Sequence, residues 1–291
     1  MPVSAPAANS FAAQLDRLGP GGPLELPGRG TTWVRDIPGP RGAPTVVLLH
    51  GLTATADLNW FTSYQALSRR YRVVAMDHRG HGRGIRSRRR FRLSDCADDV
   101  AAVADRLGID RFTAIGYSMG GPIAQLTWHR HRSRVSGLVL CATSRNFRGR
   151  PRERLMFGFL GGAVPAARLS RGWLRTQWAE RFVAGRVPDE EPLAEWLREQ
   201  FRQSDPADTI EAASALGRFS SHGWIHDVDV PTAVVVTEND GLVPAHRQRK
   251  LLEAIPGAVE VTVAGDHSVC VSDPAAFVPA LLEACRLVTR T

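Results

Sequence analysis

A serine between two glycines has the spacing of a nucleophile held in a sharp turn. Residues 116–120 read Gly-Tyr-Ser-Met-Gly, which centres the motif on Ser118. The apolar run 112–117 predicts a strand before the serine, and residues 121–135 predict a helix after it. Such a turn strains the serine backbone, needs small neighbours, and lifts the hydroxyl above the sheet beside a helix N-terminus. We therefore expect Ser118 to act as a nucleophile.

A serine hydroxyl attacks well only when a base takes its proton, and the chain has nine histidines. His267 directly follows the apolar run 258–264, so we expect it at the same sheet edge as Ser118. His50 and His78 also follow predicted strands but precede the serine, and the other six lie in predicted helices or connections. We predict that His267 is the base; the alternative is a surface-loop histidine.

The base in turn needs a carboxylate that holds its tautomer and stabilises its charged form. Asp240 lies in the turn after the predicted strand 232–237. The order Ser118, Asp240, His267 is the one expected when these groups sit on a parallel sheet. The nearest rival carboxylates are Glu238 and Asp266.

Attack on a carbonyl also requires donors for the oxyanion that forms. The backbone N–H of Met119, directly after the nucleophile, is one candidate. The loop after the strand 45–50 supplies the other, and there we choose the N–H of Leu52. Gly51 lets the chain turn at this point. We expect His50 to have a structural role, bracing this loop.

Elements at regular intervals must hold these groups in place. Strands are predicted at 45–50, 71–77, 112–117, 135–141, 232–237 and 258–264, and helices at 94–107, 121–135, 246–255 and 274–288, with Ser94 and Asp273 as N-caps. Strands that alternate with single helices imply right-handed crossovers and a mainly parallel sheet covered on both faces. Ligands of such sheets bind at the carboxyl ends of the strands.

The alternation breaks between residues 146 and 226, which hold four of the seven tryptophans and six of the eleven phenylalanines. We predict a helical cap over 146–226, inserted between two parts of an α/β core, 31–145 and 227–291, with 1–30 as an N-terminal arm. The aromatic side chains either line an apolar pocket or pack the insertion onto the sheet. Gly51, Tyr117, Trp173 and Trp178 are the predicted substrate contacts.

The charge of the chain is strongly positive and comes almost entirely from arginine. The formal net charge is +8, and Lys250 is the one lysine. We interpret the arginines as solvated and paired with acids, and expect no nucleic-acid partner, because no recognition motif accompanies them. The segment 83–92 holds six arginines in ten residues. It is either an ordinary solvated loop or a rim that attracts an anionic substrate or a lipid surface.

Other features bear on location. No stretch approaches about eighteen consecutive apolar residues, and 1–30 lack a basic start and an apolar core, so we predict neither a membrane span nor a signal peptide. Cysteines 96, 141, 270 and 285 match no zinc or redox spacing. We expect buried free thiols, which are typical of a reducing compartment, and hence a cytoplasmic protein.

Five features of the sequence carry a resemblance to a known family: His50-Gly51, the run Asp77-His-Arg-Gly-His-Gly82, the motif 116–121, Asp240 and His267. With them, the chain resembles the α/β-hydrolase fold family over about residues 30–290. The resemblance implies an eight-stranded, mostly parallel sheet, a cap inserted after its sixth strand, and cofactor-free chemistry through an acyl-enzyme. It also implies that Asp77 shapes a loop near the site. Relatives with an aspartate nucleophile cleave epoxides or carbon–halogen bonds, and Ser118 argues against that chemistry.

The expected activity is hydrolysis of a carboxylic ester of a fairly apolar small molecule or lipid. The same triad in similar proteins cleaves carbon–carbon bonds, hydrolyses monoacylglycerols or forms peracids, and the motifs do not separate these reactions. A ligand receptor without catalysis is a further alternative. The acyl chain length and the oligomeric state are not encoded in any motif of the chain.

Overall fold

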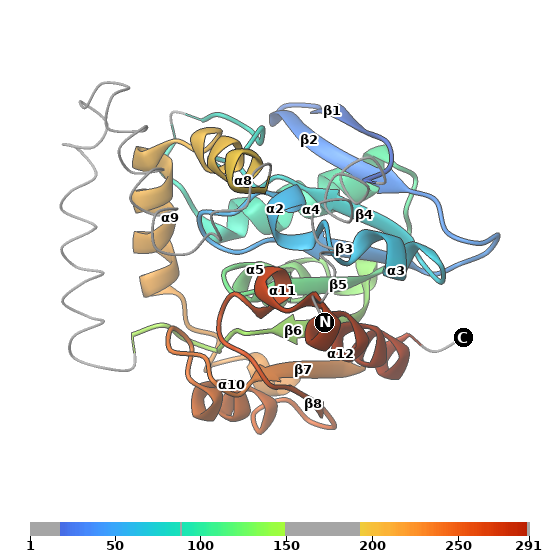
Figure 1. The fold of residues 1–291 in the computed structure, drawn as a ribbon, viewed down its shortest axis with the longest axis vertical. Coiled ribbons are helices and arrows are strands. Elements are labelled where there is room, and N and C mark those ends of the chain that lie inside the picture. The colour runs from blue at the N-terminus through green and yellow to red at the C-terminus, as the bar shows by residue number, and fades with distance from the viewer. Residues whose placement is uncertain (1–17, 88, 149–192, 290–291) are drawn as a thin grey trace, which may run out of the picture.

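A single sheet of eight strands organises the protein. The computed structural model describes residues 18–87, 89–148 and 193–289. The strands are β1 (Gly21–Leu26), β2 (Gly30–Ile37), β3 (Thr45–Leu49), β4 (Arg72–Met76), β5 (Phe112–Tyr117), β6 (Val135–Cys141), β7 (Thr232–Thr237) and β8 (Val259–Val263). Their order is β1-β2-β4-β3-β5-β6-β7-β8, running from top to bottom in Figure 1.

The direction of the strands confirms the prediction of a mostly parallel sheet. The six strands from β4 to β8 in spatial order pair in parallel, whereas β2 pairs antiparallel with both β1 and β4. All six strands predicted from apolar runs are present, each within about two residues of its predicted bounds. Their carboxyl ends share one edge, where Ser118 follows β5 and Asp240 follows β7.

The core lies on both faces of the sheet because successive strand residues point to opposite sides. In β3, Val47 and Leu49 belong to one buried cluster, while Val46 and Leu48 belong to the other. A strand buried on both faces is continuously apolar, which explains why the short runs in the sequence could be recognised as strands.

Helices cover the two faces. They include α2 (Ala56–Trp60), α3 (Tyr64–Ser68), α4 (Leu93–Arg106), α5 (Gly120–Arg130), α10 (Ala245–Leu252), α11 (Val269–Ser272) and α12 (Pro274–Val288), with a short 3-10 turn η1 (Arg132–Arg134) after α5. Buried residues of α4, α5 and α10 join one cluster, and those of α2, α3, α11 and α12 join the other.

The N-terminal part differs from the prediction. Residues 21–26 form β1 and Gly30 begins β2, so the sheet starts before the expected boundary at 31. The reason is a hairpin: Gly28 has φ 71°, and the Arg29 N–H donates to the Leu26 carbonyl at 2.9 Å. Pro27 and Gly28, which were among the residues that indicated an arm, form this turn instead. Residues 1–17 lie outside the described residues.

One predicted helix cap was wrong and another is confirmed. Ser94 lies inside α4, which begins at Leu93 with Arg92 at the N-cap position and no side-chain cap. Asp273 caps α12, since its side chain accepts from the Ala276 N–H at 3.1 Å. The cap before Pro274 was recognisable because proline at the first helical position and aspartate before it act together.

The described part of the predicted cap comprises residues 146–148 and residues 193–226. Residues 193–226 form α8 (Leu193–Arg202), α9 (Pro206–Arg218) and, at their end, the 3-10 turn η2 (Ile225–Asp227). These elements lie against the loops that follow β3 and β4: the Thr55 hydroxyl donates to Gln200 Oε1 at 2.7 Å, and the Gly82 N–H donates to Ser204 Oγ at 3.1 Å. The insertion therefore reaches the edge of the sheet that carries the strand ends (Figure 1).

Four of the described aromatic residues of the insertion pack against the core. Phe147 and Phe219 are buried in one core cluster. Trp224 stacks on His129 with ring centroids 4.3 Å apart, and Trp196 meets Phe61 at 5.2 Å. For these residues the packing interpretation holds. Trp173 and Trp178 lie outside the described residues.

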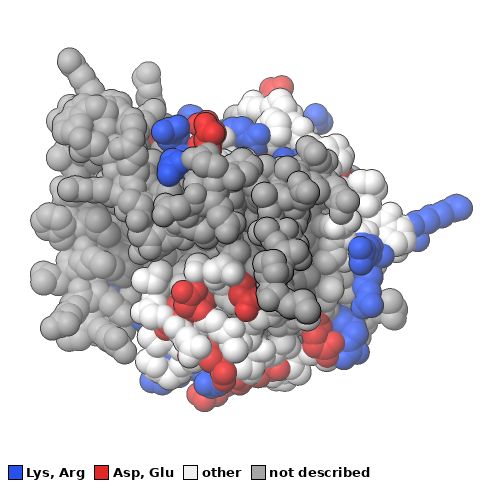
Figure 2. All heavy atoms as spheres, viewed as in Figure 1, with Lys and Arg blue, Asp and Glu red and all other residues white. Residues whose placement is uncertain are grey.

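The remaining composition-based expectations concern thiols, membranes and charge. All four cysteines are free and buried. Among the residues that the structure describes, no helix is both long and apolar enough to span a bilayer. In Figure 2, acidic side chains spread over the lower part of the visible face and basic ones gather at its right edge, so the charges on this face are mixed.

Candidate active site

Ser118 sits in a strained turn between β5 and α5. Its φ is 52°, a left-handed value that non-glycine residues rarely adopt. The flanking glycines are required sterically: a Cβ at Gly116 would lie 2.2 Å from the Gly120 carbonyl oxygen, and one at Gly120 would lie 2.0 Å from the Leu49 carbonyl oxygen. The turn predicted from the motif is therefore present, with the space that only glycine leaves.

Hydrogen bonds fix the backbone of Ser118 on both sides. Its N–H donates to the Cys141 carbonyl at 2.9 Å, and its carbonyl accepts from the Thr143 hydroxyl at 2.7 Å. Thr143 also packs closely against Gly121, because a Cβ added at Gly121 would lie 2.2 Å from Thr143 Oγ1. A strained backbone conformation persists only when the surrounding structure holds it in place, and here the sheet does so.

His267 lies between the two other members of the predicted triad. Its Nε2 is 2.9 Å from Ser118 Oγ, and its Nδ1 is 2.7 Å from Asp240 Oδ2. The carboxylate accepts only, so the network places the ring hydrogen on Nδ1 and leaves Nε2 to accept from the serine. The rival carboxylates point elsewhere: Asp266 accepts from Ser268, and Glu238 pairs with Arg249.

A buried network orients Asp240. Oδ1 accepts the N–H groups of Leu242 and Val243 at 2.8 and 2.7 Å, and Oδ2 accepts the Thr237 hydroxyl at 2.9 Å. The Gln248 amide, from α10, donates to Thr237 Oγ1 at 2.7 Å. Sequence reasoning missed Thr237 and Gln248, since neither belongs to a motif and their contact spans eleven positions of the chain.

Two backbone donors lie near the serine without protein acceptors. Neither the Leu52 N–H nor the Met119 N–H donates to any of the described residues. Gly51 lies close to Ser118, since a Cβ there would be 3.3 Å from Ser118 Cβ, and its own N–H donates to Asn59 Oδ1 at 2.9 Å. The expected oxyanion donors thus have no acceptor in the part of the chain that the structure describes.

His50 braces the loop that carries Gly51. Its Nε2 accepts the His78 N–H at 2.9 Å, so its Nδ1 carries the hydrogen and donates to the Gly51 carbonyl at 2.8 Å. Burial lowers the pKa of His50 well below its ordinary value, and the nearby His78 and His81 add to this. The histidine is neutral, as its bracing role requires.

His78 and His81 complete a buried histidine cluster with His50. The ring of His78 is 4.2 Å from that of His50, and His81 is 5.5 Å from it. Burial lowers the pKa of His78 to about 3 and that of His81 to about 4. Neither ring nitrogen of His78 has a hydrogen-bond partner among the described residues.

Asp77 shapes the neighbouring loops, in agreement with the resemblance. It is fully buried, and its carboxylate accepts from the Ala56 and Arg83 N–H groups, both at 2.8 Å. Burial raises its pKa to about 6. Its two acceptor contacts tie the start of α2 to the loop after β4.

Tyr117 differs from its predicted role as a substrate contact. Its side chain is only 3% exposed and belongs to the core cluster that contains Phe277. Its hydroxyl donates to the His267 carbonyl at 2.9 Å. The physical reason is strand alternation, which turns the residue before Ser118 into the core, so Tyr117 positions His267.

The arginine-rich segment 83–92 is partly tied to the protein. Arg83 lies 3.0 Å from Asp57 and stacks 3.7 Å from the Trp33 ring centroid. Arg86 donates to the carbonyls of Gly82 and Gln203. Arg83 and Arg86 thus connect the segment to other parts of the protein, which departs from the expectation of a purely solvated loop. Residue 88 lies outside the described residues.

The site as a whole can carry out acyl transfer. It combines a serine hydroxyl, a base in contact with it, a buried carboxylate behind the base, and unused N–H donors. Within 18–87, 89–148 and 193–289, no group of three or more His, Cys, Asp or Glu side chains is arranged to hold a metal ion.

Comparison with known proteins places the chain in a family. Residues 44–274 match the model of the α/β hydrolase fold. The dihydrolipoyllysine-residue acetyltransferase component of the acetoin cleaving system from Pseudomonas putida is 28% identical over 79% of this chain, and the match spans 60% of that longer protein. A Rhizobium rhizogenes protein with the provisional name carbamate hydrolase RutD is 28% identical, over 81% of this chain and 90% of its own length.

Among solved structures, the enol-lactonase from Burkholderia xenovorans LB400 superposes with a TM-score of 0.76 at 23% identity, covering 91% of this chain and all of the other. At this identity the likeness concerns the fold. The family model covers most of the chain, in agreement with the eight-stranded sheet and the strained serine turn. The chain therefore belongs to the α/β hydrolase fold family.

Proposed function

We propose that the protein hydrolyses a carboxylic ester of a fairly apolar small molecule or lipid, with Ser118, His267 and Asp240 as its catalytic triad. The observation that carries the proposal is the position of His267, in hydrogen-bond contact with Ser118 Oγ at 2.9 Å and with Asp240 at 2.7 Å. This is the geometry that a base needs to take a serine proton.

The proposed reaction has two halves. Ser118 Oγ attacks the ester carbonyl while its proton passes to His267 Nε2, and the N–H groups of Leu52 and Met119 stabilise the oxyanion. The imidazolium then gives the proton to the leaving alcohol, which breaks the ester bond and leaves an acyl-serine. Water, activated by His267, releases the acid and restores the serine.

The choice of an ester rests on relatives and on the insertion. A lactone is a cyclic ester, so the enol-lactonase likeness favours an ester as the substrate. The aromatic-rich stretch 146–226 favours an apolar acyl or alcohol group. As proposed here, 146–226 is a helical cap, with Trp173 and Trp178 as substrate contacts. The contacts of α8 and of the turn between α8 and α9 with the loops after β3 and β4 support the cap.

Substitution of the serine tests the proposal. Ser118→Ala should lower hydrolysis of p-nitrophenyl esters by about 10⁴-fold or more and abolish labelling by a fluorophosphonate. Ser268→Ala is the matched control, because its exposed hydroxyl neighbours His267 yet bonds only to Asp266 and Ser272. Labelling that survives in Ser118→Ala would contradict the assignment.

A carbamate is a second candidate substrate, because the Rhizobium rhizogenes relative carries that name. The same nucleophile would attack the carbamate carbonyl. Rates on an ester and a carbamate of the same alcohol, measured beside a dienone and a monoacylglycerol, separate these reactions. A preference of at least about tenfold, or about 1.4 kcal/mol in transition-state binding, identifies the natural class.

A further inference from the structure

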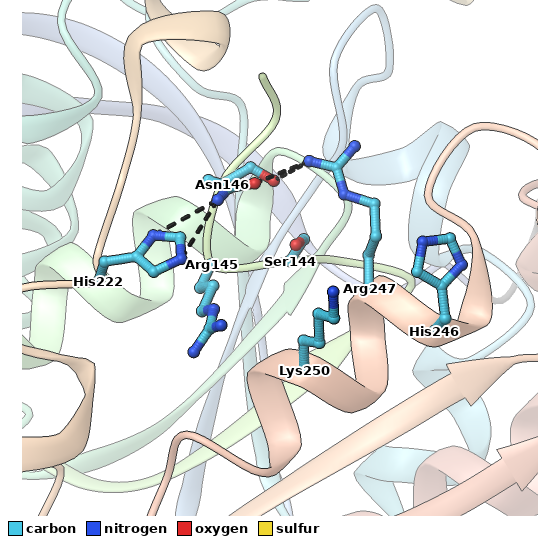
Figure 3. Close-up of a pocket in the computed structure, with 7 residues that line it drawn as sticks. All are labelled: Ser144, Arg145, Asn146, His222, His246, Arg247 and Lys250. Atoms are coloured by element: carbon cyan, nitrogen blue, oxygen red, sulfur yellow. Dashed lines mark hydrogen bonds between the residues drawn. The ribbon is translucent and has the colours of Figure 1, made fainter. Parts of the chain in front are cut away.

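A pocket that is separate from the proposed triad lies at the edge of the sheet that carries the carboxyl ends of the strands. It has a volume of about 220 Å³. The residues that line it come from the segment after β6, from α10 and from the turn before β7, and none of them belongs to the triad: Ser144, Arg145, Asn146, His222, His246, Arg247 and Lys250 (Figure 3).

Three cationic side chains line this pocket, and two of them, on Arg145 and Lys250, have no counter-charge among the described residues. Arg145, Arg247 and Lys250 are all cationic at neutral pH, and no carboxylate is among the described residues that line the pocket. Lys250 is also the only lysine of the chain. Elsewhere many arginines are paired with acids, as in Arg130–Asp98 and Arg286–Glu283.

Two of these cations have no partner among the described residues. Neither the Arg145 guanidinium nor the Lys250 amine makes a hydrogen bond or ion pair with any residue that the structure describes. Their charge acts on the surroundings: burial lowers the pKa of His222, and the nearby Arg145 lowers it further. Among the described residues, Arg145 and Lys250 therefore present two positive charges to the pocket that no acid neutralises.

The wall of the pocket is built in advance. Arg247 is 8% exposed and donates to the Asn146 carbonyl oxygen at 2.6 Å and to Asn146 Oδ1 at 2.8 Å. With its Oδ1 accepting from Arg247, Asn146 turns its side-chain nitrogen towards His222, 3.4 Å away. Figure 3 shows this chain of contacts spanning the pocket above Lys250.

We propose that this pocket binds the phosphate group of a small phosphorylated molecule. The charges of Arg145 and Lys250 exceed what one monovalent carboxylate neutralises, whereas a phosphate monoester carries about two negative charges and three acceptor oxygens. Arginine forks and a lysine ammonium on different elements can meet those oxygens from several sides. The volume equals that of roughly seven water molecules of about 30 Å³, which leaves room for the phosphate and the atoms that bear it.

The single lysine allows a direct test in the intact protein. Reductive methylation with ¹³C-formaldehyde keeps the charge of Lys250 and labels only this side chain and the chain's N-terminal amine. The signal is assigned with Lys250→Met. Inorganic phosphate, glycerol 3-phosphate and pyrophosphate are then titrated at constant ionic strength, with chloride and acetate as comparison anions.

The expected result is a saturable shift of the Lys250 signal by the phosphate compounds, with little response to chloride or acetate. Tighter binding of glycerol 3-phosphate than of inorganic phosphate identifies a phosphorylated small molecule, and the reverse order identifies free phosphate. Arg145→Met should weaken binding about tenfold, because it removes a charge-assisted contact. Arg249→Met, one position from Lys250 but paired with Glu260, should leave it within about twofold.

Equal responses to phosphate and acetate, or equal losses in Arg145→Met and Arg249→Met, would overturn the proposal. The test is independent of the proposed hydrolysis. Ser118→Ala should bind phosphate as the unaltered protein does, so failure of the anion site and failure of the triad are distinguishable.

Discussion

The hydroxyl of Tyr117 donates a hydrogen bond of 2.9 Å to the main-chain carbonyl of His267. The residue before the serine thereby holds the backbone of the proposed base, and the two rings also meet edge to face at 5.8 Å. This single contact links the end of β5 to the loop after β8. It explains how the side chains of Ser118 and His267, which are 149 positions apart in sequence, keep a contact of 2.9 Å.

Tyr117→Phe tests this link. The ring still packs against Trp60 and Phe277, so the fold should persist with a stability loss of about 1 kcal/mol. Without its tether the His267 loop is less well positioned, so kcat on an ester should fall about threefold to tenfold while KM stays unchanged.

Tyr71→Phe is the control for this change. Its hydroxyl contacts Thr289 Oγ1 at 3.2 Å, away from the site, so it should leave kcat unchanged. Equal kcat values for both tyrosine variants would show that the tether does not position His267.

Gln248→Leu tests the network behind Asp240. The substitution removes the donor to Thr237 Oγ1 and to the Val243 carbonyl, both at 2.7 Å. We expect kcat to fall about tenfold, because the hydroxyl that orients the carboxylate is no longer held. Steady-state kinetics on one ester measure the effect, and Glu253→Gln, at the exposed end of the same helix, should have none. An unchanged kcat in Gln248→Leu would remove this residue from the support of the triad.

Gly116→Ala tests the steric requirement of the turn. A methyl group there would lie 2.2 Å from the Gly120 carbonyl oxygen, so the free energy of unfolding should drop by at least about 3 kcal/mol. Gly22→Ala in β1 is a matched change with open space around it, and it should stay within about 0.5 kcal/mol of the unaltered protein. Urea denaturation compares the two, and similar midpoints would contradict the packing described for the turn.

The buried histidine cluster predicts loss of stability in mild acid. The pKa of His78 is lowered to about 3 and that of His81 to about 4, so below about pH 6.5 the unfolded chain binds protons that the folded chain does not. The stability that these neutral histidines contribute is therefore fully present above about pH 6.5. It is lost as the pH drops towards their lowered pKa values. Asp77, with its pKa raised to about 6, opposes this trend between about pH 6 and pH 4, because the folded state takes its proton first.

The histidine contribution can be isolated by substitution. Urea unfolding at about pH 7.5 and about pH 5 should show a smaller loss for His78→Leu than for the unaltered protein. His226→Leu, which changes an exposed histidine, should retain the full loss. The same loss in His78→Leu would mean that His78 is not a source of the acid sensitivity.

The parts of the fold that could be predicted are those whose signals are local. A doubly buried strand such as β5 or β7 is continuously apolar, and Ser118 and Asp240 follow these two strands. His267 follows the edge strand β8, in which valines alternate with polar residues. β1 is half-exposed and depends on pairing with β2, so its residues alone resemble a turn-rich arm. The role of Tyr117 depends on which face of the sheet receives its side chain, and the supports Thr237 and Gln248 are brought together only by the packing of α10 on β7.

The hydrogen bond from the Ser118 N–H to the Cys141 carbonyl extends the ladder between β5 and β6 by one step, into the strained turn itself. This amide should therefore exchange its hydrogen with solvent only when the centre of the sheet opens, at a free energy near that of global unfolding. The proposed nucleophile then belongs to the slowest-opening unit of the molecule. Any motion that admits a substrate has to occur in the chain around the serine, while the serine itself stays in register with the sheet.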